Sequence, residues 1–346
     1  MQPDLPIPLL CADGLSREFD LPGGGIFSRR RRLEAVSDVS FSIGRREVLG
    51  LVGESGSGKT TIGRMVMRLL PPTRGRLLFD GVDLTALSGR NLRAQRRRFQ
   101  MVFQDPYASL NPRMRVREIV EEPLLVHGLE PDPSSRRDRV ARLLERVGLS
   151  PRDMDRLPRE FSGGGRQRVG IARAIACGPE LLVADEPIAS LDLSMGAQII
   201  NLFSSLVDGE AMSLLFISHD IPMVRYLSDR VAVLYRGRIV ESGPAGAVLD
   251  DPRHPYTRLL ADGTLPEAEV PASPQSGTES GAAGLCAFLP RCARALPECR
   301  KAPPPRLSGG ESREVLCHLP QGESSWSPVH LKAQGSPSHV PATPSR

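Results

Sequence analysis

Residues Phe161–Asp192 read FSGGGRQRVGIARAIACGPELLVADEPIASLD and carry two signals in one stretch. A Ser-Gly-Gly turn at residues 162–164 opens a helix, where free backbone N–H groups favour a bound phosphate. An apolar run at Leu181–Ala184 then ends in Asp185 and Glu186. A buried strand that ends in carboxylates is typical of an α/β sheet, because ligands of such sheets bind at the carboxyl ends of the strands.

Upstream, Gly53–Thr61 reads GESGSGKTT and lies between an apolar strand at Glu47–Val52 and a helix. This is the context that a phosphate-binding loop requires. Its glycines let N–H groups curl around an anion, Lys59 can reach the terminal phosphates, and Thr60 can ligate Mg²⁺. The predicted nucleotide-binding residues of this loop are Gly53, Glu54, Ser55, Gly56, Ser57, Gly58, Lys59, Thr60 and Thr61.

Four polar side chains at strand ends are candidates for the chemistry of phosphoryl transfer. Asp185 would hold magnesium, and Glu186 would orient and polarise the attacking water as a general base. Gln104 follows the strand FQMVF and could touch the metal or the water. His219 ends the strand SLLFIS and could contact the γ-phosphate, although a lone histidine is more often structural.

Composition limits the remaining classes of function. The chain has 346 residues, of which 40% are hydrophobic, enough for a large core. No run approaches the roughly 18 to 20 apolar residues needed to cross a bilayer. The net charge of +5 rests on arginines, with only three lysines. Because the arginine clusters lack interleaved aromatics, we interpret them as a solvated face and expect no binding to nucleic acid.

The hydrophobic pattern changes along the chain. Residues 15–50 alternate like antiparallel strands, whereas 116–148 has helical periodicity broken at Pro131–Pro133. After Asp192, strands and helices alternate, which predicts an α/β core with a largely parallel sheet. Beyond about residue 250, Pro, Gly, Ala and Ser become frequent, and 321–346 is expected to be disordered.

The order of the motifs from the phosphate loop to the strand-end histidine resembles the ATP-binding cassette (ABC) ATPases across about residues 10–250. This resemblance implies an α/β P-loop NTPase fold with a RecA-like parallel sheet core, an antiparallel β subdomain and a helical subdomain at about 106–175. The predicted cassette is 10–255. The segments FQDPYASLNPRM, HDIPMVRYLSDRVAVLYRGRIVESG and DPRHPYTRLL are further similar to the ATP-binding subunits of oligopeptide, dipeptide and nickel importers.

The resemblance also implies an assembly. Two ATPase subunits would meet head to tail around ATP and Mg²⁺, so that Ser162, Gly163 and Gly164 act on the partner's ATP. Phe19 would stack on adenine, Gln104 would couple the site to the transporter, and Asp192 would link the two sites. The pair would drive two permease subunits at the cytoplasmic face of the membrane, fed by an external substrate-binding protein.

The sequence departs from the family pattern at three places. Ile188 replaces the usual threonine, and Ala189-Ser190 inverts the common Ser-Ala. Gly165 stands where the family usually has glutamine, and this changed signature keeps another function open. A weakly hydrolysing regulatory partner in an asymmetric pair is therefore an alternative. A further alternative is a cassette ATPase that acts on nucleic acid or ribosomes. Such proteins usually carry two cassettes or a long coiled coil, and this sequence has neither.

Four cysteines lie in the predicted C-terminal extension, 256–320, with the spacing C-x5-C-x6-C-x17-C. A segment too short for its own core often needs a metal or disulfides, and a reducing compartment disfavours disulfides. The spacing lacks the CxxC pairs of zinc ribbons, which disfavours zinc. The resemblance implies a possible 4Fe–4S cluster, with free thiols as the alternative. The candidate ligands are Cys286, Cys292, Cys299 and Cys317.

Overall fold

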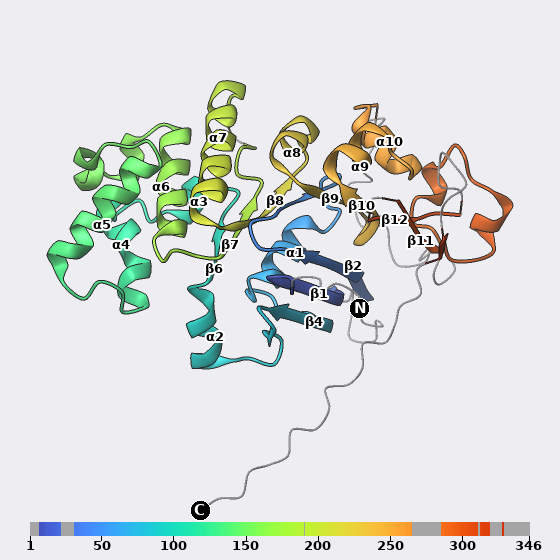
Figure 1. Ribbon diagram of the computed structural model, residues 1–346, viewed down its shortest axis with the longest axis horizontal. Helices are drawn as coiled ribbons and strands as arrows, with labels where there is room; N and C mark the ends of the chain where they lie inside the picture. Colours follow the sequence, from blue (N-terminus) through green and yellow to red (C-terminus); the bar gives the residue numbers. More distant parts are fainter. Residues whose placement is uncertain are drawn as a thin grey trace, which may run out of the picture.

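Two β-sheets form the frame of the chain in the computed structural model (Figure 1). The structure describes residues 7–21, 31–189, 191–264, 285–310, 312–318 and 327–328. The smaller sheet is antiparallel, in the order β2 (Arg31–Ile43), β1 (Leu10–Leu21), β4 (Arg74–Phe79) and β5 (Val82–Asp83). The larger sheet has the spatial order β13 (Ser327–Pro328), β11 (Arg306–Gly309), β12 (Arg313–Leu316), β10 (Arg238–Pro244), β9 (Arg230–Tyr235), β3 (Val48–Val52), β8 (Ser213–Ser218), β7 (Leu181–Asp185) and β6 (Phe99–Val102).

The strands from β9 to β6 run parallel, as the apolar runs predict. Both faces of this part of the sheet are buried. In β7, for example, Leu182 and Ala184 belong to one hydrophobic core, whereas Leu181 and Val183 belong to the other. A strand covered on both faces must be apolar at every position, which explains its continuous rather than alternating pattern. The expected α/β cassette with a parallel core is confirmed.

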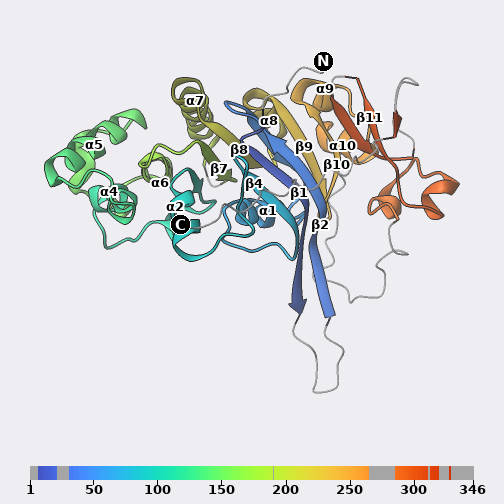
Figure 2. The same cartoon turned by 60° about the horizontal axis from the view of Figure 1, so that its bottom comes forward.

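Helix α1 (Lys59–Val66) follows β3 directly and packs between the two sheets. Its buried residues Ile62, Met65 and Val66 share one core with residues of both sheets. Figure 2 shows the antiparallel strands β1 and β2 extending past the body of the molecule. The helix that follows the phosphate loop therefore begins at the junction of the two sheets.

The helices at the opposite end of the molecule from the C-terminal strands form the expected helical segment (Figure 1). Asp132 caps α5 by accepting a hydrogen bond of 2.8 Å from the Ser135 amide, and Pro133 occupies the first turn. This cap explains the break in the helical pattern. The helices and short 3-10 turns here are α3 (Pro106–Ser109), α4 (Val116–Val126), α5 (Pro133–Arg146), η1 (Pro151–Asp155), η2 (Pro158–Glu160) and α6 (Gly163–Ile175).

The described C-terminal residues extend the larger sheet, and Phe288 and Val315 among them belong to the core of the cassette. Strand β12 pairs with β10, and Glu241 of β10 accepts a 2.7 Å hydrogen bond from the Arg313 guanidinium. The Glu241 side chain is fully buried and also accepts from the His254 amide at 2.9 Å. The remaining helices are α2 (Gly89–Arg96), α7 (Leu193–Glu210), α8 (Ile221–Leu227), α9 (Ala245–Asp250) and α10 (Pro255–Ala261), with turns η3 (Leu289–Arg291) and η4 (Pro297–Arg300).

Of the segment expected to be disordered, 321–346, only Ser327–Pro328 is described. These two residues form β13 and pair with Leu307 and Ser308 of β11. The other residues of 321–346 lie outside the described residues, so the expected disorder stays a prediction for them. Within the part of the chain that the structure describes, no helix is both long and apolar enough to span a bilayer.

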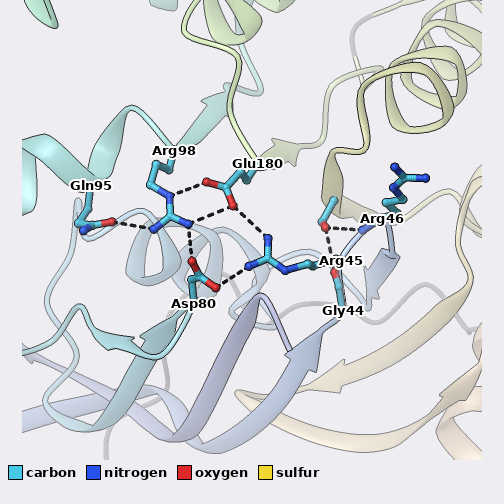
Figure 3. Close-up of polar contacts among 8 residues, drawn as sticks. Gly44, Arg45, Arg46, Asp80, Gln95, Arg98 and Glu180 are labelled. Atoms are coloured by element: carbon cyan, nitrogen blue, oxygen red, sulfur yellow. Dashed lines mark hydrogen bonds and ion pairs between the residues drawn. The ribbon is translucent and has the colours of Figure 1, made fainter. Parts of the chain in front are cut away.

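An ion-pair network joins the two sheets at the amino-terminal ends of the parallel strands (Figure 3). Arg98 donates to Glu180 at 3.0 Å and to Asp80 at 2.6 Å, and Arg45 donates to Glu180 at 3.1 Å. The Arg98 guanidinium also lies 4.9 Å from the centre of the Phe79 ring. Hydrogen bonding to Arg98 lowers the pKa of both Glu180 and Asp80 below their usual values.

We expect Arg98→Met to lower the free energy of unfolding by about 1 kcal/mol at pH 7, a modest effect because the network is partly solvated. The lowered pKa of Glu180 means that this contribution is present above its ordinary pKa and is lost as the pH falls through the folded-state value. Urea unfolding at pH 7 and below pH 4 measures both. The exposed Arg90 supplies the matched control, Arg90→Met. An equal loss at both pH values would contradict this assignment.

Candidate functional site

The phosphate-binding loop connects β3 to α1, as its sequence context predicts. Gly53 and Gly58 have φ values of 154° and 107°. A Cβ on Gly53 would lie 2.2 Å from the Leu234 carbonyl oxygen, and one on Gly58 would lie 2.7 Å from that of Ala35. Both positions therefore require glycine, because a side chain would meet backbone as well as a strained conformation.

Lys59 is 4% exposed and points back into its own loop. Its ammonium group donates to the carbonyl oxygens of Gly53 at 2.8 Å and Glu54 at 3.0 Å. It also lies 3.7 Å from a carboxylate oxygen of Glu186. Burial lowers the pKa of Lys59, and the charge of Glu186 opposes this shift. The lysine and the second carboxylate therefore lie at one site although 127 residues of sequence separate them.

Thr60 and Asp185, the two predicted magnesium ligands, contact each other. The Thr60 hydroxyl donates to a carboxylate oxygen of Asp185 at 3.1 Å. Asp185 is 3% exposed, and this burial raises its pKa. A hydroxyl and a carboxylate at this spacing offer the oxygen ligands that magnesium prefers, together with phosphate oxygens. These residues fit a magnesium ion bound with a nucleotide.

Glu186 stands one residue beyond β7 with a φ of 44°, an uncommon conformation for a residue with a side chain. Its carboxylate lies 3.0 Å from the Nδ1 atom of His219, which follows β8. Its amide donates to the Ile217 carbonyl oxygen at 2.9 Å. The conformation turns the carboxylate from the strand toward the neighbouring histidine, so that the two predicted residues form one pair.

Gln104 and Phe19 are located relative to the site only by the strands that precede or carry them. Gln104 is exposed two residues after β6, which pairs with β7, so it lies at the same edge of the sheet as Asp185. Phe19 is half-buried in β1, where the Arg17 guanidinium lies 4.9 Å from the centre of its ring. Phe27, the other aromatic of this region, lies outside the described residues. The role of Phe19 with adenine stays a prediction.

The Ser-Gly-Gly turn begins α6. Ser162 caps the helix by accepting from the Gly165 amide at 3.2 Å. A Cβ on Gly164 would lie 1.9 Å from the Cε atom of Met195, whereas one on Gly165 would lie 3.1 Å from Phe161 side-chain atoms. Gly164 thus allows α7 to approach closely, while a residue with a side chain at position 165 would require Phe161 to move slightly.

Helix α6 lies with the helical segment and α1 lies at the centre of the molecule (Figure 1). The glycine turn at the start of α6 and the phosphate loop therefore belong to different parts of this chain. Asp192 begins α7 by accepting from the Met195 amide at 2.8 Å. Asp192 also lines a pocket with Glu186 and His219. This pocket connects the carboxylate–histidine pair to the segment predicted to link two sites.

Two residues at the phosphate loop were not predicted from the sequence. The Tyr256 hydroxyl accepts a 2.9 Å hydrogen bond from the Glu54 amide. The Arg291 guanidinium forms two hydrogen bonds of 2.9 Å to the Glu54 carboxylate. The signal for Tyr256 was the segment HPYTRLL, which ATP chemistry does not demand. Arg291 precedes Cys292, a predicted metal-site ligand, and no sequence pattern marked Arg291 itself.

The four cysteines of the C-terminal region line one pocket, together with His254 and His318. Burial raises the pKa of the Cys286 thiol, and the charges of Cys292 and Cys299 act in the same direction. In the described residues, no three His, Cys, Asp or Glu side chains are grouped so that they could hold a metal ion. The expected iron–sulfur or zinc site is therefore not confirmed.

The glycine loop, the buried lysine and the Thr60–Asp185 and Glu186–His219 pairs on a parallel sheet define an ATP-binding cassette ATPase. The family described as ABC transporter matches residues 36–189, and the family described as oligopeptide/dipeptide transporter, C-terminal region, matches 240–299. This chain belongs to the ATP-binding subunits of the peptide-importer family of ABC transporters, and it is an ATPase.

Relatives match nearly the whole chain. "Putative oligopeptide transport ATP-binding protein YkfD" of Bacillus subtilis is 43% identical over 329 residues, covering 90% of this chain and 96% of the relative. A "Putative peptide import ATP-binding protein" of Brucella abortus is 50% identical over 321 residues, covering 90% of this chain and 94% of the relative.

Solved cassettes share the fold over two thirds of the chain. A dimeric post-hydrolysis state of the ATP-binding cassette MJ0796 bound to ADP and Pi has a TM-score of 0.62 at 28% identity, covering 68% of this chain and 98% of that one. The cbiO1 protein of Clostridium perfringens, part of the ABC transporter complex cbiONQ, has a TM-score of 0.61 at 26% identity, covering 70% and 91%.

Proposed function

We propose that this ATPase powers the import of peptides by two permease subunits at the cytoplasmic face of a membrane, together with a second ATPase subunit and an external substrate-binding protein. The support for peptide cargo is the match of residues 240–299 to a peptide-transporter region and the names of the relatives. No relative named above favours the alternative of an ATPase that acts on nucleic acid or ribosomes.

One observation carries the catalytic part of this proposal: the phosphate loop and the ends of β7 and β8 bring Lys59, Thr60, Asp185, Glu186 and His219 together. The loop amides and Lys59 bind the phosphates of ATP, and Thr60 and Asp185 hold magnesium. The bound magnesium ion neutralises phosphate charge. Glu186 orients the attacking water and accepts its proton, while His219 contacts the γ-phosphate and positions the carboxylate.

The proposed assembly is a head-to-tail pair of ATPase subunits. Ser162 caps α6, which lies with the helical segment, whereas the phosphate loop leads into α1 at the centre of the molecule (Figure 1). This arrangement is expected if the Ser-Gly-Gly turn acts on ATP held by the other subunit. Asp192 shares a pocket with Glu186 and His219, which supports its proposed role in linking the two sites. Within this assembly Gln104, exposed after β6, contacts the metal and couples the site to the permeases, and Phe19 stacks on adenine.

The transport function can be tested in vesicles. We expect that the chain, co-purified with its permeases and a second ATPase subunit, hydrolyses ATP and accumulates a labelled peptide only when the substrate-binding protein is present. A complex that hydrolyses ATP without moving any peptide in a mixed peptide library would contradict the proposed cargo and leave the ATPase assignment intact.

We further propose that the four-cysteine pocket holds a 4Fe–4S cluster. One zinc ion draws its sulfurs to within about 2.3 Å of a single point, whereas a cluster is held by thiolates around its outside. The support for a cluster is that Cys286, Cys292, Cys299 and Cys317 all line one pocket. His254 supports this proposal, because it is 1% exposed, lines the pocket, and its Nε2 atom is buried without a hydrogen-bond partner among the described residues.

His254 can serve such a site only as a neutral donor. Its Nδ1 atom accepts from the Tyr256 amide at 3.0 Å, which leaves the proton on Nε2. Burial lowers the pKa of His254 to about 4, so the ring is neutral at physiological pH. His254 lines the pocket, and its N–H group could donate to a thiolate or sulfide there, an interaction that tunes iron–sulfur sites.

Anaerobically purified protein is expected to carry about four iron atoms per chain and to absorb broadly in the visible range. Replacing Cys292 by serine should remove most of that absorbance. Cys177 is half-buried and outside the pocket, so that Cys177→Ser is the matched control. Stoichiometric zinc, or a folded protein with neither metal, would refute the cluster.

A further inference from the structure

We propose that Arg291 and Tyr256, which lie outside the recognised ATP-binding motifs, are positioning residues for the phosphate loop and tune the affinity for ATP. Both contact Glu54, the second residue of that loop. Tyr256 comes from α10, and Arg291 comes from the turn η3 in the C-terminal region. The proposal rests on the ATPase activity of the chain and not on its transport cargo.

Tyr256 fixes the orientation of the peptide group between Gly53 and Glu54. Its hydroxyl holds the amide side of that group at 2.9 Å, and Lys59 holds the carbonyl side at 2.8 Å. Tyr256 is fully buried, and its ring centre lies 4.5 Å from that of Tyr235 and 5.6 Å from that of Phe288. A hydroxyl on a ring packed this tightly cannot follow the loop, so it determines which loop amides face the nucleotide.

Arg291 neutralises a charge that opposes ATP binding. Glu54 places a carboxylate on a loop that must surround a polyphosphate, and like charges repel at short range. Arg291 meets this carboxylate through two hydrogen bonds of 2.9 Å, a bidentate geometry that is stronger and more directional than a single ion pair. Arginine is charged at physiological pH in any case, and the contact to Glu54 raises the pKa of Arg291 further.

The Arg291 side chain is itself held in place. The guanidinium carbon lies 5.8 Å from the centre of the Phe288 ring and 5.9 Å from that of Tyr235. The amide of Arg291 donates to the Phe288 carbonyl oxygen at 2.9 Å. Phe288 is 1% exposed and packs against Tyr235, Tyr256 and His254. These packed aromatic side chains therefore hold Arg291 beside the phosphate loop.

The test uses the full-length chain and compares Arg291→Gln, Glu54→Gln and the double variant. We expect Arg291→Gln to weaken binding of a fluorescent ATP analogue and to raise the KM for ATP by about 5- to 10-fold, with kcat within about twofold of the original. The loop charge acts equally on ATP and on the transition state, so only binding should change. In the double variant, Glu54→Gln should restore binding, because no carboxylate is left to neutralise.

Arg300→Gln is the matched control, since Arg300 is an exposed arginine of the same C-terminal region. It should leave KM and kcat unchanged. Tyr256→Phe keeps the packed ring, removes only the hydroxyl, and should raise KM by about threefold. The proposal is overturned if Arg291→Gln leaves ATP affinity unchanged, or if Glu54→Gln fails to rescue it. If Arg291→Gln does not fold, unchanged ATP affinity in Tyr256→Phe decides against it.

Discussion

Replacing Glu186 by glutamine is expected to lower kcat for ATP hydrolysis by about 100- to 10,000-fold, the range that general-base catalysis supplies. Glutamine has nearly the same size as glutamate and can still lie beside His219. It cannot accept the proton of the attacking water at physiological pH. The loss should therefore fall on hydrolysis and leave the phosphate loop intact.

Binding of ATP should be retained or become tighter in Glu186→Gln. The carboxylate of Glu186 lies 3.7 Å from the Lys59 ammonium and competes with phosphate for this cation. Removing its charge frees Lys59 for the nucleotide. Single-turnover hydrolysis and equilibrium binding of labelled ATP separate the two effects. Glu145→Gln, at an exposed position of α5, is the control for loss of a carboxylate. Wild-type turnover in Glu186→Gln would rule out Glu186 as the base.

The phosphate loop and the carboxylates could be predicted because each is decided locally. Gly53 to Gly58 form a tight turn between a buried strand and a helix, and Asp185 ends a strand that is buried on both faces. Neighbouring parallel strands end at the same edge of the sheet, so that Asp185, Glu186 and His219 follow from the strand pattern alone. These contacts needed no knowledge of how distant side chains pack.

The contacts of Glu54 could not be predicted in this way. Arg291 lies 237 residues away along the chain, and its partner is decided by how η3 packs on Tyr235 and Tyr256. No periodic pattern marks such a contact. The same limit applies to the C-terminal region as a whole. Its sequence indicates that it is too small for its own core, but not that β12 would pair with β10 through the buried Glu241–Arg313 contact.

A substitution in the Ser-Gly-Gly turn gives the most direct test of the proposed pair of subunits. Ser162→Arg should reduce ATP hydrolysis more than about tenfold, because a long cation replaces the serine cap at the helix start that, in the proposed pair, faces the partner's phosphates. Binding of ATP to an isolated chain should not change, because Lys59 and its loop lie in another part of the molecule. Ser205→Arg, on the exposed side of α7, is the matched control.

Mixing two inactive variants distinguishes a shared site from a site within one chain. If the chain pairs with itself, an equal mixture of Ser162→Arg and Lys59→Ala should recover about a quarter of the original activity. Half of the pairs would be mixed, and each would keep one site with an intact Lys59 from one chain and an intact Ser162 from the other. A site built within a single chain would recover none, since every chain then carries a defect. Loss of ATP binding by isolated Ser162→Arg would equally place Ser162 at its own chain's nucleotide and reject the head-to-tail arrangement.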